Sequence, residues 1–232
     1  MQTVRSANRM PQGEAKERIL DAAEELFANS GLDGVSFRDL AGSAGVSLSA
    51  IHYHFGSKIL VLSEIFDRRA RALVDRRRVL LEGLPRDAAG HLPVSGMLDA
   101  FLRPAFEVTH GDRNDLFNRL LARLAVERSD IMRTIISRCF DENDLLFINE
   151  LKRALPHLTL QDVHWRFHFL VGAMIYTMSD SGQLVGLSQG QCTAADTKRA
   201  SQNIVESFTA LFQHGQNRFA TTATPVDAVH PR

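Results

Sequence analysis

The sequence predicts an all-α protein with a small N-terminal three-helix domain followed by a larger C-terminal helical bundle. Three observations predict this fold class. Apolar residues recur every three or four positions through most of the 232 residues, and alternating strand-like patterns are almost absent. Serines that can cap helices and glycines that can end them stand between the apolar segments. A cluster of Gly, Pro and Asp in "GLPRDAAGHLP" separates a first group of helices from a second.

The first helix follows a polar, irregular stretch, and we expect residues 1–12 to form a flexible arm. The helix is expected from about Glu14 to Ser30, because its apolar residues form one stripe. Gly31 can end it, since glycine readily adopts the left-handed conformation that closes many helices. The stripe consists of Ile19, Ala22, Ala23, Leu26 and Phe27.

The second helix has a clear start and stop. Ser36 can cap a helix over Phe37–Ala44, Asp39 can bond back to the cap, and Gly45 ends it. The next two helices begin in the same way. Ser47 is expected to cap a third helix, Leu48 to about Phe55, and Ser57 a long fourth one that reaches about Leu81. The short connection between the second and third helices gives a helix-turn-helix pattern.

Five further helices are expected beyond the break. They are Val94–His110, Arg113–Arg128, Ser129–Leu155, Thr159–Asp180 and Thr193–His214. The predicted organisation is an arm (1–12), a helix-turn-helix domain (13–73), a bundle domain (74–214) and a disordered tail (215–232).

Composition narrows the class of protein. The chain is 44% hydrophobic and 23% charged, which is typical of a soluble globular protein, and its 27 Lys and Arg balance its 27 Asp and Glu. The two cysteines, Cys139 and Cys192, are isolated, which suits a reducing compartment. The N-terminus has no apolar signal segment, and stretches such as "FLVGAMIYTM" are shorter than the roughly 20 residues that cross a bilayer. We therefore expect a cytoplasmic protein without a membrane partner.

The third helix has two different faces. At about 100° per residue, Leu48, Ile51 and Phe55 share one face, with His52 at its edge. Small residues, hydroxyls and imidazoles point outward, from Ser49, Ala50, Tyr53 and His54. These groups suit phosphate oxygens, and Lys58 adds a cation at the start of the next helix. The pattern indicates a recognition helix whose flanks contact a nucleic-acid backbone.

The run "RILDAAEELFANSGLDGVSFRDLAGSAGVSLSAIHYHFGSK" resembles the DNA-binding domain of the tetracycline-repressor (TetR) family of bacterial transcription regulators. The resemblance covers Lys16 to about Phe66. It implies that Arg38 reads a guanine edge and that residues at the start of the third helix lie at the groove floor. The implied DNA-binding residues are Ser36, Arg38, Ser47, Leu48, Ser49, Ala50, His52, Tyr53, His54 and Lys58.

Other interpretations of these residues remain open. His52 and His54 diverge by about 200° on a helix, which disfavours a shared metal. Tyr53 and His54 could be packed residues of the core, and Arg38 a solvated surface charge. From Met1 to Lys58, six Lys and Arg stand against seven Asp and Glu, a net charge of about −1. This balance predicts modest DNA affinity that depends on two copies binding together on a palindrome.

The second domain is rich in phenylalanine, which indicates either ordinary core or an apolar cavity between helices. The stretch from about Asn114 to Ser179 resembles the C-terminal domain of a fatty-acid-responsive subgroup of the same family. The resemblance rests on Asn114-Asp115-Leu116, Arg119-Leu120-Leu121, Trp165-Arg166, His168-Phe169, Gly172-Ala173 and Met178-Ser179. It implies a small apolar effector such as a fatty acyl compound, with aromatic or steroid-like molecules as the alternative. The expected ligand-binding residues are Phe101, Phe106, Phe117, Leu121, Leu124, Phe140, Trp165, His168, Phe169 and Met174.

A second surface is expected to pair with a copy of itself. Gly172-Ala173 allows another helix to approach closely, and Ile204, Ser207, Phe208 and Leu211 form a stripe on the last helix. The family resemblance likewise implies a homodimer through the last two helices. His157, His164 and His168 have spacing that could suit a metal, but no carboxylate or cysteine completes the set, so no metal or cofactor is expected.

The three classes of function can now be compared. The sequence favours a dimeric, ligand-released repressor of transcription. An enzyme is disfavoured, since there is no Gly-rich phosphate loop, no G-x-S-x-G elbow and no complete metal set. The third class is a helical adaptor that binds protein through the same surface, which the acidic N-terminal unit would suit.

Overall fold

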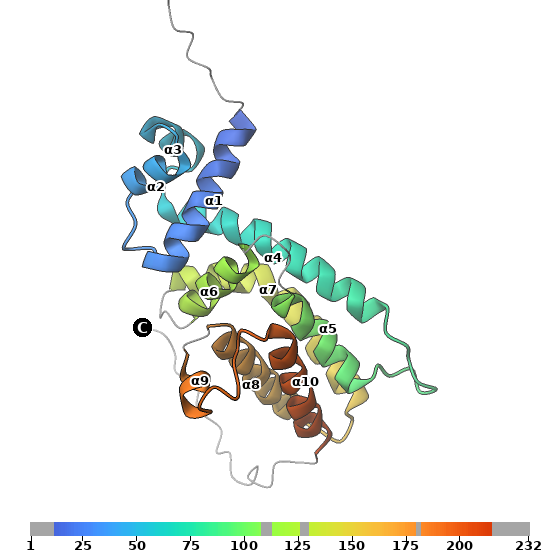
Figure 1. Ribbon diagram of the computed structural model, residues 1–232. Helices are drawn as coiled ribbons and strands as arrows, with labels where there is room; N and C mark the ends of the chain where they lie inside the picture. Colours follow the sequence, from blue (N-terminus) through green and yellow to red (C-terminus); the bar gives the residue numbers. More distant parts are fainter. Residues whose placement is uncertain (1–11, 108–112, 126–129, 180–181, 215–232) are drawn as a thin grey trace, which may run out of the picture.

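The computed structural model describes residues 12–107, 113–125, 130–179 and 182–214. The expected tail (215–232), and all of the expected arm except residue 12, lie outside these ranges. Within them the chain forms ten α-helices and no strand, as the sequence predicts (Figure 1). The helices are α1 (Gln12–Ser30), α2 (Phe37–Ala44), α3 (Leu48–His54), α4 (Lys58–Glu82), α5 (Val94–Phe106), α6 (Arg113–Ala125), α7 (Asp130–Ala154), α8 (Leu160–Met178), α9 (Gln183–Leu187) and α10 (Thr197–Gln213).

The N-terminal unit consists of α1, α2, α3 and the start of α4. A capping box begins α2, because Ser36 and Asp39 bond to each other's backbone, and Gly45 ends it in the left-handed conformation at φ 62°. Ser47 and Ser57 cap α3 and α4 as predicted. The caps fix where α2, α3 and α4 begin, and these helices pack with α1 around a small core. The fully buried residues of this core include Ile19, Phe27, Leu40, Ile51 and Val61.

Helix α4 joins the two parts of the molecule. Its 25 residues span about 37 Å at 1.5 Å per residue, and it runs from the N-terminal unit along the bundle (Figure 1). It packs on α1 at one end and on α5 and α7 at the other. The predicted domain boundary between residues 73 and 74 therefore falls inside one continuous helix.

The bundle of α5 to α8 and α10 surrounds an aromatic core. The ring of Phe101 lies edge-on to Phe147 and Phe167, with centroids 5.2 and 4.9 Å away. Helix α10 packs beside α5 and α8. The buried Phe212 closes its last turn, where Arg166 donates to the carbonyls of Leu211, Phe212 and His214.

Several boundaries differ from the prediction. Helix α5 ends at Phe106, because the backbone of Glu107 is extended (ψ 103°); residues 108–110 of the expected helix lie outside the described residues. The last helix starts at Thr197, since Asp196 rather than Thr193 is its cap. The five-residue helix α9 was not predicted, because five residues are too few for a helical repeat to be recognised.

Candidate nucleic-acid interface and ligand cleft

The N-terminal ends of α2 and α3 carry the residues predicted to contact DNA. Arg38 is exposed in the first turn of α2. The hydroxyl of Ser36 donates to Asp39 at 2.6 Å and accepts from the backbone N–H of Asp39 at 3.2 Å. The hydrogen bonds from the side chain and backbone of Ser36 lower the pKa of Asp39. Asp39 thus stays anionic, and the capping box fixes the turn from which Arg38 projects.

The start of α3 presents small polar groups. Ser47 accepts from the backbone N–H of Ala50 at 3.2 Å, and the hydroxyls of Ser47 and Ser49 lie 2.9 Å apart. Leu48 was predicted to lie on the packed face together with Ile51 and Phe55. That placement is wrong, because Leu48 is 38% exposed while the other two are buried. Leu48 is thus partly exposed at the start of α3, between Ser47 and Ser49.

The aromatic and imidazole groups lie on the outer side of α3. Tyr53 is 73% exposed, which rules out the alternative that it belongs to the core. His52 is exposed and rests edge-on against Phe37, with ring centroids 5.0 Å apart. His54 is half-buried between Tyr53 and Phe55, at centroid distances of 5.3 and 6.1 Å. Tyr53 therefore offers the most accessible hydroxyl donor of this helix.

Lys58 occupies a different place from the one expected of a phosphate-binding cation. Its Nζ donates to the carbonyls of Leu32 at 2.7 Å and Val35 at 2.9 Å. Two of its three N–H groups therefore hold the turn between α1 and α2 against the start of α4. Lys58 therefore positions that turn, and one of its three N–H groups remains after these two hydrogen bonds.

The residues predicted to bind a ligand fall into two groups. Trp165, His168 and Phe169 lie on the outer face of α8, where Trp165 is 54% and Phe169 53% exposed. The resemblance named these three residues, but it does not show that this face of α8 points away from the bundle. The others are buried in the bundle: Phe101, Phe106, Phe117, Leu121, Leu124, Phe140 and Met174. The structure thus does not bring the two groups together in one site.

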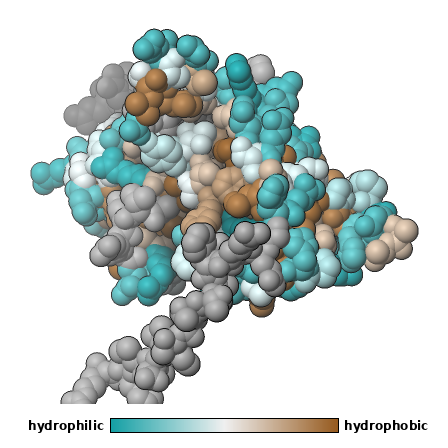
Figure 2. Space-filling view, turned by 90° about the horizontal axis from the view of Figure 1, so that it is seen from below, coloured by the Kyte–Doolittle hydropathy of each residue, from teal (hydrophilic) through white to brown (hydrophobic). Residues whose placement is uncertain are grey.

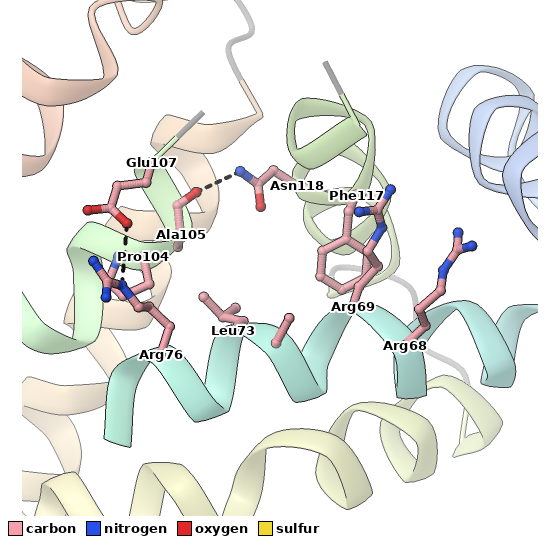
Figure 3. Close-up of a pocket in the computed structure, with 10 residues that line it drawn as sticks. Arg68, Arg69, Leu73, Arg76, Pro104, Ala105, Glu107, Phe117 and Asn118 are labelled. Atoms are coloured by element: carbon pink, nitrogen blue, oxygen red, sulfur yellow. Dashed lines mark hydrogen bonds and ion pairs between the residues drawn. The ribbon is translucent and has the colours of Figure 1, made fainter. Parts of the chain in front are cut away.

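A cleft of about 450 Å³ lies between α4, α5 and α6, and its walls are partly basic (Figure 3). Arg69 and Phe117 lie at one end, Arg76 and Glu107 at the other, and Leu73 between them. Asn118 joins α6 to α5 by donating to the carbonyl of Ala105 at 2.7 Å. Of the residues predicted to bind a ligand, only Phe117 is among those that line this cleft. The arginines were missed because sequence spacing alone does not tell a cleft-facing arginine from a solvated one.

A second hollow, of about 740 Å³, lies between α6 and α8. Arg119 and Arg123 line one side, and His168, Gly172 and Tyr176 the other. It opens beside the exposed aromatic face of α8. A Cβ added at Gly172 would meet no atom within 4 Å, so nothing in the described part of the same chain fills the space over this glycine.

One charged side chain lies inside the bundle core. Arg77 is 2% exposed, stacks over the ring of Phe101 at 3.7 Å and donates from Nε to the carbonyl of Phe101 at 2.8 Å. Its Nη1 lies 3.8 Å from the carboxylate of Asp144. Burial lowers the pKa of Arg77 to about 10 and raises the pKa of Asp144 to about 6, although each charge favours the other.

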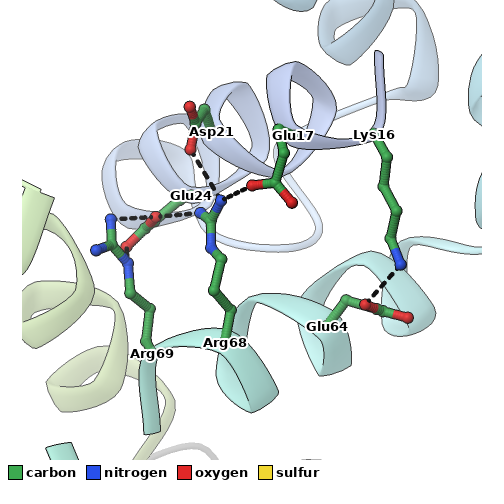
Figure 4. Close-up of polar contacts among 7 residues, drawn as sticks. All are labelled: Lys16, Glu17, Asp21, Glu24, Glu64, Arg68 and Arg69. Atoms are coloured by element: carbon green, nitrogen blue, oxygen red, sulfur yellow. Dashed lines mark hydrogen bonds and ion pairs between the residues drawn. The ribbon is translucent and has the colours of Figure 1, made fainter. Parts of the chain in front are cut away.

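Helices α1 and α4 are joined by a group of ion pairs (Figure 4). We call Glu17, Asp21, Glu24, Arg68 and Arg69 the α1–α4 clamp. Its centre is Glu24, which is fully buried and accepts from both arginines. Three of the seven acids counted up to Lys58 are thus paired with cations beyond that point. The charge of these three acids is therefore offset by arginines of α4 that the count up to Lys58 leaves out.

The histidines at 157, 164 and 168 are all exposed. Among the residues that the structure describes, no group of three or more His, Cys, Asp or Glu side chains is arranged to hold a metal ion. No helix in the same ranges is long and apolar enough to cross a membrane.

The arrangement defines a class of protein, an all-helical molecule with a helix-turn-helix unit joined by one long helix to a separate bundle. Residues 19–65 match the family described as "Bacterial regulatory proteins, tetR family". Residues 99–210 match "Tetracyclin repressor-like, C-terminal domain". The two matches together cover more than half of the chain, which belongs to the TetR family. This family consists of transcriptional regulators and not enzymes, so the rejection of an enzyme is confirmed.

Individual relatives are distant. The chain is similar to the HTH-type transcriptional regulator SrpR of Pseudomonas putida, with 22% identity over 148 residues, 64% of this chain and 62% of that regulator. The alignment thus spans less than two thirds of SrpR. Among solved structures, FadR of Bacillus subtilis in complex with stearoyl-CoA has a TM-score of 0.64 at 16% identity, covering 84% of this chain and 97% of that one. A fatty acid metabolism regulator of Clostridium perfringens has a TM-score of 0.62 at 17% identity, covering 83% and 97%. These structures share the fold.

Proposed function

We propose that the protein is a homodimeric DNA-binding repressor that a small apolar effector, a fatty acyl compound, releases from a palindromic operator. The observation that carries this proposal is the surface formed by the start of α2 and the outer side of α3. It combines an exposed arginine, serine hydroxyls, small residues that permit close approach, and an exposed tyrosine. Membership of a family of regulatory proteins supports the same conclusion.

Each residue of this surface has a role in the proposal. Arg38 reads a guanine edge in the major groove, with two parallel hydrogen bonds. Ser49 and Ala50 lie close to the groove floor, where Leu48 contacts a thymine methyl. Tyr53 and His52 donate to phosphates. Ser36, Ser47 and Lys58 hold the turns, and the N-terminal N–H groups of α2 and α3 favour the phosphates electrostatically.

The dimer in this proposal forms through α8 and α10. Trp165, Phe169 and Tyr176 are each more than half exposed, at 54%, 53% and 60%, and follow one another along one face of α8. In the view from below, apolar residues reach the surface in the middle of the face, with hydrophilic residues around them (Figure 2). Covering apolar area of this kind with a second copy lowers the free energy, because the area is removed from water. Leu211 on α10, 40% exposed, extends the face.

The effector is proposed to bind between the helices of the bundle. Buried phenylalanines such as Phe101 and Phe117 supply apolar walls, and the FadR structure contains an acyl-CoA in a similar fold. Aromatic or steroid-like molecules are the competing ligand class. Effector and DNA are coupled if each prefers a different form of the protein. An effector that binds more tightly to a form with displaced α4 than to the DNA-binding form lowers DNA affinity by the difference between its two binding free energies.

Selection of random duplex DNA by the purified protein tests the DNA-binding proposal. We expect a palindromic site whose binding is weakened by about 1–3 kcal/mol on Arg38→Ala, with relaxed specificity at one base pair. Tyr53→Ala should weaken binding to all sequences alike. Arg153→Ala is the matched control, because Arg153 is 62% exposed at the far end of α7, where it pairs with Glu150. If no sequence is enriched, the helical adaptor is the function to pursue.

A further inference from the structure

We propose that the cleft between α4, α5 and α6 binds an amphipathic anion whose charged group takes Arg69 from Glu24 and so opens the α1–α4 clamp. The ligand is an apolar chain that ends in a carboxylate or a phosphate. This inference rests on the proposed effector control, to which it adds a ligand charge, a site and a route to the DNA-binding unit.

The cleft and the clamp share two side chains. Arg68 and Arg69 line the cleft, and both also bind carboxylates of α1. Arg69 donates from Nε and Nη2 to the two oxygens of Glu24, each at 2.8 Å. Arg68 donates from Nη1 to Glu17 at 2.8 Å and Asp21 at 3.1 Å, and from Nη2 to Glu24 at 3.0 Å. The same guanidinium groups thus face two possible anionic partners.

These arginines retain capacity for another acceptor. Among the described residues, Arg69 binds Glu24 through Nε and Nη2, so a ligand anion first meets the two N–H groups of Nη1 and from there draws the guanidinium away from Glu24. The Nε of Arg68 is buried and has no hydrogen-bond partner among the described residues. Such a donor is costly to leave unsatisfied, and an anionic group in the cleft supplies an acceptor to the arginine pair.

The charge of the cleft selects the ligand class. Three guanidinium groups, of Arg68, Arg69 and Arg76, stand against the carboxylate of Glu107, which lies 3.8 Å from Arg76. The lining of the cleft therefore favours an anion over a cation, and that anion competes with the clamp carboxylates Glu17, Asp21 and Glu24, which already pair with Arg68 and Arg69. Leu73, Pro104 and Phe117 supply apolar surface between the charged ends, which suits the chain of an amphipathic molecule.

Loss of Arg69 changes the balance at Glu24. This carboxylate is fully buried, so it depends on both arginines for the charge that offsets its burial. With Arg69 turned to the ligand, Glu24 keeps only Arg68, and α1 is held less firmly on α4. Phe117 of α6 connects the ligand to α4 at a second point. Its side chain lines the cleft, and its ring lies edge-on to the buried Phe66 of α4, with centroids 5.3 Å apart.

Calorimetric titration of the full-length protein tests the ligand class. The probes are palmitate, palmitoyl-CoA and the uncharged hexadecanol, each kept below the concentration at which it forms micelles or separates from water. We expect at least one of the two anions to bind tenfold or more tightly than hexadecanol, and comparing the two separates a carboxylate from a phosphate. Arg76→Gln, which does not touch α1, should weaken anion binding about tenfold. Arg78→Gln is the control, since Arg78 pairs with Glu142 outside the cleft.

A second variant tests the competition itself. Because Glu24 competes with the ligand for Arg69, Glu24→Gln should tighten anion binding, by roughly 5- to 150-fold if the coupling has the usual size. Hydrogen exchange in α1 should become faster both in this variant and on anion binding to the wild type. A purely structural Glu24 would give faster exchange but no gain in affinity.

Equal binding of hexadecanol and both anions, or unchanged anion affinity in both Arg76→Gln and Glu24→Gln, would overturn the proposal. None of these readouts uses DNA. A failure here is therefore distinct from a failure of the DNA-binding proposal.

Discussion

The buried pair of Arg77 and Asp144 makes stability depend on pH in an unusual direction. Burial raises the pKa of Asp144 from 3.8 to about 6, against the attraction of Arg77 and with a smaller contribution from the like charge of Asp141. A carboxyl whose pKa is raised in the folded state binds its proton more tightly there than in the unfolded chain. The folded state is therefore penalised as pH rises from about 4 through about 6.

The size of the change in the free energy of unfolding follows from the size of this pKa shift. Each pKa unit corresponds to about 1.36 kcal/mol, so a shift from 3.8 to about 6 corresponds to roughly 3 kcal/mol. The side chain of Asp144 is 26% exposed, so solvent screens only part of this effect. Asp144→Asn removes the titration while keeping the shape. The two proteins should be similarly stable near pH 4, and the variant more stable by about 2–3 kcal/mol near pH 7.

Urea unfolding of both proteins across this pH range measures the difference directly. All other ionisable groups are common to both chains, so subtracting the two free energies of unfolding isolates Asp144. A difference that stays constant with pH, or that favours the wild type as pH rises, would refute the reasoning. It would mean that the attraction of Arg77 outweighs the burial of the carboxylate.

The remaining predictions concern local geometry and assembly. Ser36→Ala removes the capping box of α2 and should cost about 1 kcal/mol, read as a lower urea midpoint. Gly45→Ala places a side chain at φ 62° and should cost about 1–2 kcal/mol in the same assay; an unchanged midpoint would contradict that backbone conformation. Trp165→Ser with Phe169→Ser should shift sedimentation from dimer toward monomer at unchanged helicity, whereas the exposed Leu145→Ser on α7 should not.

The N-terminal unit could be predicted closely because its signals are local. The Ser36–Asp39 capping box and the left-handed Gly45 depend on neighbours within a few residues. The caps at Ser47 and Ser57 follow the same rule. Such contacts can be found from spacing alone, since the partners are fixed by the helix itself.

The bundle could be predicted only in part, because its important contacts join distant residues. Arg69 meets Glu24 from 45 positions away, so no window along the chain reveals the pair. The family resemblance named Trp165 and Phe169 as ligand-binding residues, but it did not show whether they face the core. Lys58 was expected at a phosphate, but its ammonium holds the carbonyls of a turn more than 20 residues earlier.

The most direct test of the central claim is the affinity of the purified protein for the selected duplex, measured by fluorescence anisotropy at several salt concentrations. Counterion release predicts that the logarithm of the association constant falls linearly with the logarithm of salt concentration, with a slope of about −0.9 per phosphate contacted. The account predicts a steep slope and two chains for each symmetric duplex. A flat slope, or equal affinity for a scrambled duplex, would contradict it.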